Sequence, residues 1–328
     1  MPPSTMKKST FLIFVLILFV KCTSSPKGNQ KIIPNSSGNI NTVTVVMPEK
    51  DWNSGLGNSL RALLMVPYEG LPLDEPQFSL KYLNPKVFSG FARQSRNIIW
   101  FVKDSLSDFQ MMQDAFARPQ IVALFKGNDA EEHRFYLEEN AALIRQSFSE
   151  NERVEKLRRI NKAPTTENSL KNRFGLSMIY PSAYETVKDT TNFIWIQKPI
   201  TKGHLNLIAY TLPEAALKPP VNQTIIRIRD SIGKKYVPGR LPNSYMITEK
   251  AYLPYFYKTK LDQKETYLTK GTWEVQNDFM AGPFINYMIK DTVQKRWVVV
   301  EGFSFAPSIS KRDYMFELNT IISTLKIP

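Results

Sequence analysis

The sequence predicts an α+β fold with mainly antiparallel sheets and long helices packed on one face. Apolar residues make up 42% of the 328 residues, which is enough to bury a sizeable core. Strand patterns and helix patterns occur in blocks rather than in strict alternation, and this order favours the α+β class. Near the C-terminus, three apolar runs follow one another closely, as they do in an antiparallel meander.

The N-terminus predicts a signal peptide over residues 1–21. Lys7 and Lys8 precede an unbroken apolar run at residues 11–20. A helix over this run would cover about 15 Å, half of a bilayer core of about 30 Å. The run is therefore too short for a stable spanning helix.

Cys22 is the only cysteine of the chain and directly follows the apolar run. No Ala-x-Ala cleavage site is present, and the position of Cys22 resembles a bacterial lipobox, although Phe19 and Lys21 depart from the usual pattern. We expect acylation of Cys22, which anchors a protein stably when more than one chain is attached. The alternative is a buried or incidental cysteine.

Residues 22–41 are rich in turn formers and predict a flexible tether. The acidic stretch typical of surface-exported lipoproteins is absent after Cys22. We therefore expect a periplasm-facing protein, with the inner leaflet of the outer membrane favoured.

The first half of the body, residues 42–165, should contain strands and two helices. Asp51 can cap a helix that continues through Leu64, and a long helix should run over residues 130–161 with a kink or break near Glu150. Strands are predicted at residues 43–47, 78–83, 97–103 and 120–125.

The polar segment 163–172 is the expected boundary with the second half, residues 166–328. Strands are predicted at residues 176–180, 192–198 and 205–210, followed by a helix. The order is similar to that of the first half, so an internal duplication is one interpretation and coincidence the other.

The C-terminal elements are the clearest. Ser310 should cap a last helix whose apolar positions continue to Leu325. The meander strands are expected at residues 272–276, 284–289 and 296–305.

A search for catalytic motifs returns none of the common phosphate-binding, nucleophile-elbow or zinc-protease patterns. His133 should lie on a solvated first turn of a helix and His204 in a surface turn. No catalytic residue, metal site or cofactor is predicted. The one open enzymatic alternative places Glu301 in a cleft with Arg312 or Tyr314.

Basic residues exceed acidic ones, 43 to 30. One interpretation is a cationic surface for an anionic envelope polymer; nucleic acid fits the charge but not the signal peptide. The other is solvated charge with local pairing, such as Glu152 to Lys156. The surface would comprise Arg227, Arg229, Lys234, Lys235 and Arg240.

Several separate motifs resemble the Bacteroidetes lipoprotein family known as domain of unknown function 4837. They are spread over nearly the whole mature chain, and they imply an exported lipoprotein but transfer no catalytic residues. The motifs are Asp51-Trp-Asn, Gly70-Leu-Pro, Arg96-Asn-Ile-Ile, Arg118-Pro-Gln-Ile-Val, Phe193-Ile-Trp, Met280-Ala-Gly-Pro-Phe and Glu301-Gly-Phe-Ser-Phe-Ala-Pro.

Four tripeptides resemble the Asp-[Ser/Thr]-apolar pattern at which Bacteroidetes attach O-glycans to exported proteins. The alternative is ordinary turn and cap chemistry. The predicted glycan positions are Ser105, Thr190, Ser231 and Thr292.

Together these patterns favour a noncatalytic, lipid-anchored envelope protein that binds an envelope component or forms part of a protein complex. The alternative is an envelope hydrolase or transferase with an unfamiliar active site.

Overall fold

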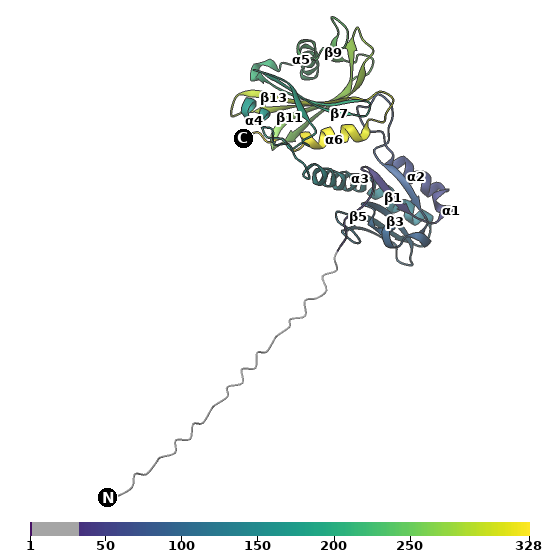
Figure 1. The fold of residues 1–328 in the computed structure, drawn as a ribbon. Helices are drawn as coiled ribbons and strands as arrows, with labels where there is room; N and C mark the ends of the chain where they lie inside the picture. Colours follow the sequence, from purple (N-terminus) through teal and green to yellow (C-terminus); the bar gives the residue numbers. More distant parts are fainter. Residues whose placement is uncertain (2–32) are drawn as a thin grey trace. The chain divides into compact units, whose positions relative to one another are not determined.

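The computed structural model describes Met1 and residues 33–328, and Figure 1 shows two sheets in this part of the chain. Residues 33–328 form one compact unit with its own buried cores. The proposed signal peptide, Cys22 and most of the proposed tether lie outside the described residues. Within those residues, no helix has the length and apolar character needed to cross a membrane.

The first sheet has five strands in the order β2-β1-β3-β5-β4. Only β4 runs antiparallel to its neighbour, so the expectation of mainly antiparallel pairing is wrong for this sheet. Parallel neighbours need crossovers: helices lie between β1 and β2, short 3₁₀ turns lie between β2 and β3, and the connection from β3 to β5 runs through β4. The strands are β1 (Thr42–Val46), β2 (Ser79–Leu83), β3 (Asn97–Lys103), β4 (Asp108–Gln113) and β5 (Ile121–Gly127).

Helices cover one face of this sheet, and short 3₁₀ turns cover the other. α2 begins after Ser54 rather than at Asp51, which lies in the short α1. The two helices are tightly joined, because a side chain at Gly57 would stand 2.0 Å from the carbonyl oxygen of Trp52. The elements are α1 (Glu49–Trp52), α2 (Gly55–Leu64), α3 (Ala130–Ile160), η1 (Pro85–Val87) and η2 (Gly90–Gln94).

α3 is one continuous helix of 31 residues, so of the kink or break expected near Glu150 the break is wrong. Its apolar pattern changes phase because polar residues occupy the buried positions beyond Phe148. Glu152 pairs there with buried Arg96 at 3.0 Å, while the apolar Val154 is 43% exposed. The buried polar residues are Asn151, Glu152 and Glu155.

The second sheet is antiparallel throughout, in the order β10-β11-β12-β13-β8-β7-β6, with β9 paired to β11. The α+β class is confirmed. The strands are β6 (Glu185–Thr190), β7 (Phe193–Ile200), β8 (Gly203–Pro213), β9 (Tyr245–Thr248), β10 (Tyr255–Leu261), β11 (Lys264–Gln276), β12 (Ala281–Asp291) and β13 (Arg296–Phe305).

The two sheets do not repeat one topology. β3 lies between two parallel neighbours, whereas β7 lies between two antiparallel ones. Residues 176–180, expected as a strand, make only a single bridge between Ser177 and Lys326. The pairing therefore argues against the duplication.

Helices cover both faces of the second sheet (Figure 1). α5 (Val221–Tyr236) packs on one face and α6 (Arg312–Ile322) on the other, and the short α4 (Ser169–Phe174) and η3 (Glu214–Ala216) complete the fold. Ser310 does not cap α6. Glu75 from the first half does so, because its carboxylate accepts the backbone N–H groups of Lys311 at 2.7 Å and Arg312 at 2.9 Å.

Candidate functional site

The candidate site lies where the winding of the first sheet reverses. The chain moves outward from β1 to β2, crosses back, and then moves outward from β3 to β5. In sheets wound in this way, ligands bind beyond the carboxyl ends of the strands at the point of reversal. A cavity of about 730 Å³ opens at that point.

We call this cavity the edge pocket. Its volume falls within the range of about 300–1,000 Å³ that is usual for small-molecule sites. It is lined by four separate segments: residues 48–51 after β1, three residues between 85 and 93, residues 100–103 at the end of β3, and residues 128–133 at the start of α3.

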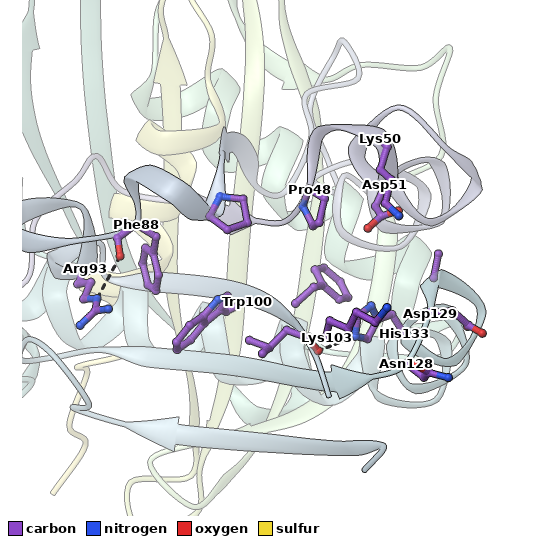
Figure 2. A pocket seen from close by; sticks show the side chains of 14 residues that line it. Pro48, Lys50, Asp51, Phe88, Arg93, Trp100, Lys103, Asn128, Asp129 and His133 are labelled. Carbon is purple, nitrogen blue, oxygen red and sulfur yellow. Dashed lines mark hydrogen bonds between the residues drawn. The ribbon is translucent and has the colours of Figure 1, made fainter. Parts of the chain in front are cut away.

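One end of the edge pocket is aromatic, as the left side of Figure 2 shows. The rings of Phe88 and Trp100 meet edge to face with their centroids 4.9 Å apart, and Phe116 lies 6.0 Å from Phe88. Arg93 donates from Nε to the carbonyl oxygen of Phe88 at 3.2 Å. This end therefore offers flat apolar walls beside one cation.

The other end, on the right of Figure 2, is polar. His133 lies here, and the expectation of a solvated histidine is wrong because its side chain is only 6% exposed. Its Nε2 lies 3.2 Å from the carbonyl oxygen of Val102, and its ring packs against Phe101. Burial lowers the pKa of His133, so the ring is neutral at neutral pH.

Gly127 allows this close packing. A side chain there would come within 2.9 Å of the His133 ring and 3.3 Å of Glu132. The end of β5 can therefore pass directly beside the first turn of α3, which brings His133 to the pocket wall.

The charged side chains that line the edge pocket do not form ion pairs. Lys50, Arg93 and Lys103 line it together with Asp51 and Asp129, and none of these five forms an ion pair within the described part of the chain. Asp129 is occupied in another way, because its Oδ1 accepts the backbone N–H groups of Glu131 and Glu132 that begin α3.

Only some residues of the predicted cationic surface are exposed. Arg229 is buried and corrects the prediction: its side chain is 2% exposed and pairs with Glu301 at 2.8 Å. Arg227, Lys234 and Lys235 are exposed on α5. Arg240 is exposed as well, but it pairs with Asp278 at 2.6 Å.

Glu301 does not line a cleft. Its carboxylate is buried and accepts hydrogen bonds from Arg229 and from Asn286, whose amide donates to Oε2 at 2.9 Å. Arg312 instead donates to the carbonyl oxygen of Pro76 in the first half at 3.0 Å. The structure therefore does not bring Glu301 and Arg312 together as a catalytic pair.

Other expected pairs and sites are distributed as follows. Lys156 pairs with Glu317 at 3.0 Å rather than with Glu152. His204 is exposed, as expected.

Among the proposed glycan positions, Thr190 is half-buried and donates to the carbonyl oxygen of Phe193. The exposed positions are Ser105, Ser231 and Thr292.

The edge pocket was missed from the sequence because its walls come from four separate segments. Two local signals were available: Pro48 ends a buried strand, and Asp129 begins a helix just after another. These signals converge only if the strands are parallel, since only then do their carboxyl ends share one edge.

Across the described residues, no group of three or more His, Cys, Asp or Glu side chains is placed to hold a metal ion.

Comparison with solved structures finds nine matching chains, of which one is described here. The solution structure of cyanobacterial PsbP (CyanoP) from Synechocystis sp. PCC 6803 aligns at 11% identity and a TM-score of 0.31. The alignment covers 47% of this chain and 87% of that one. No curated protein matches the chain.

Two family models match, one for each sheet. Residues 163–324 match the family described as domain of unknown function DUF4837, and residues 36–161 match a second family, domain of unknown function DUF8532. The expected resemblance to the first family therefore holds for the second sheet, while the motifs of the first half fall within the other match. The chain thus combines a DUF8532 match that contains the edge pocket with a DUF4837 match that contains the antiparallel sheet.

Proposed function

We propose that this chain is a noncatalytic binding protein of the cell envelope. In this proposal, acyl chains on Cys22 anchor it to a membrane, it faces the periplasm, and the edge pocket takes a small organic ligand with a flat apolar portion. The observation that carries the binding function is the position of an aromatic-walled cavity at the carboxyl edge where the strand order reverses.

The lining favours binding over covalent catalysis. It contains no serine, threonine or cysteine, and the Nε2 of His133 already contacts the carbonyl oxygen of Val102. Asp129 caps α3 through its carboxylate. A hydroxyl or thiol nucleophile paired with a free base, a usual arrangement in covalent catalysis, is therefore missing from this lining.

The cations on α5 support a second contact of the same protein. Arg227, Lys234 and Lys235 are exposed along one helix, and a surface of this kind attracts anionic polymers or headgroups through its field. We keep this as a proposal for the envelope partner, separate from the edge pocket.

The binding function is testable with N-phenylnaphthylamine, a neutral, flat fluorophore whose emission rises in apolar surroundings. We expect saturable binding to the purified 33–328 unit. Trp100→Leu should weaken binding up to about tenfold, because loss of an aromatic wall removes about 0.5–1.5 kcal/mol of contact.

Phe91→Leu is the matched control. Phe91 is 72% exposed on the neighbouring η2 turn and does not line the edge pocket, so its replacement should leave the affinity unchanged. Circular dichroism should show that both variants remain folded. No saturable binding by the unit, or equal loss in both variants, would contradict a binding function at this site.

A further inference from the structure

We propose that the ligand of the edge pocket carries an acidic group, a carboxylate, sulfonate or phosphate ester, which binds Arg93 while its flat portion lies against Phe88 and Trp100. This inference rests on the binding function proposed above and adds the chemical class and the orientation of the ligand.

The guanidinium of Arg93 is positioned by two aromatic rings and one hydrogen bond, and its remaining donors are available to a ligand. It lies over two rings, with its central carbon 5.5 Å from the centroid of Phe88 and 5.2 Å from that of Phe116. Its one hydrogen bond is from Nε to the backbone of Phe88, so both terminal amino groups lack a partner among the described residues. A stacked guanidinium with two free amino groups is suited to forked recognition of an oxyanion.

No carboxylate competes for Arg93 in the edge pocket. The two carboxylates of the lining, Asp51 and Asp129, lie at the opposite end (Figure 2). At that end they are balanced by Lys50 and Lys103. The excess positive charge of the pocket is therefore at its aromatic end.

The helix terminus at the polar end is not an alternative anion site. Two N–H groups of the first turn of α3, at Glu131 and Glu132, donate to Asp129 Oδ1 at 2.9 and 3.1 Å. An acidic ligand group placed there would meet a carboxylate instead of free donors. The polar end therefore suits a neutral group that exchanges hydrogen bonds, and the acid belongs at Arg93.

Two probes separate the acid from the flat body. Anilinonaphthalene sulfonate has the same ring skeleton as N-phenylnaphthylamine and one added sulfonate. We expect the unit to bind the sulfonate more tightly than the neutral amine. Arg93→Gln should weaken sulfonate binding about tenfold, because it removes charge-assisted hydrogen bonds to the sulfonate, and should leave the affinity for the amine unchanged.

Lys86→Gln is the matched control for charge. Lys86 is exposed on η1, a few residues from Arg93, and does not line the edge pocket. Its replacement removes the same net charge and should change neither affinity. Equal effects of the two variants would show that only the general field attracts the sulfonate, and this would overturn the inference.

The outcomes also distinguish the two proposals. If neither probe binds saturably, the binding function itself fails. If the amine binds but the sulfonate binds no better, or if Arg93→Gln leaves sulfonate affinity intact, the pocket binds ligands and only the acidic class is wrong. If Arg93→Gln weakens both probes equally, Arg93 supports the wall without contacting the acid, and the inference fails again.

Discussion

Arg229 shows how far a single residue can depart from what its charge suggests. On α5 it follows Ile225 by one helical turn and precedes Gly233 by one, and all three are buried. The guanidinium lies 3.7 Å from the centre of the Phe284 ring and pairs with Glu301. An arginine is usually assigned to the surface because of its charge. Arg229, however, lies four residues after the buried Ile225, and this helical spacing predicts that it lies on the buried face of α5.

Replacing Arg229 should be costly. Arg229→Met leaves Glu301 buried without its partner, and such a loss destabilises a protein by about 3–5 kcal/mol. The measurement is the free energy of unfolding by urea. Arg227→Met is the control, since Arg227 is exposed two residues away and its loss should have almost no effect. A similar small change in both variants would mean that the buried pair is dispensable.

Single elements were largely predictable where their apolar pattern is regular. The strand expected at residues 97–103 is β3 as observed, and the meander strands lie inside β11, β12 and β13. β4 and β6 were missed because their side chains are mostly half-buried or exposed and carry no apolar alternation. The end of α3 was misread because its buried face becomes polar, which hydrophobic periodicity cannot register.

The start of α6 provides a prediction for one element. Glu75→Ala removes the carboxylate that accepts the N–H groups of Lys311 and Arg312, and the loss of such a cap costs about 1 kcal/mol. We expect a lower melting temperature for the variant in a calorimetric scan. Asp74→Ala removes the same charge from an exposed neighbour and should leave the melting temperature unchanged. If both scans overlay the parent, Glu75 does not stabilise α6.

At the scale of the whole molecule, the sequence predicts the class but not the pairing. Blocks of strands and helices identify α+β correctly, whereas the parallel order of the first sheet depends on crossovers that no local pattern encodes. The edge pocket follows from that order, so it could not be assembled before the topology was known. For Cys22, by contrast, the sequence alone is informative, because the prediction depends only on its position directly after the apolar run.

The anchor is a property of the whole chain and can be tested in cells. We expect metabolic palmitate label on the wild-type protein and none on Cys22→Ala, because the diacylglycerol joined to the sulfur by a thioether and the acyl chain joined to the α-amino group by an amide are both carried by this cysteine. Ser24→Ala keeps Cys22 and should keep the label. Undiminished label in Cys22→Ala would end the lipoprotein proposal.

α3 forms the end of the DUF8532 match, directly before the DUF4837 match, and its length has a consequence for how such chains can be recombined. Its 31 residues span about 46 Å, and near its C-terminal end Lys156 meets Glu317 of α6 at 3.0 Å. Both side chains are almost buried, so neither charge can be left alone without cost. We therefore expect that a different second module joined after this helix would keep the stability of this contact only if it placed a carboxylate at the position of Glu317.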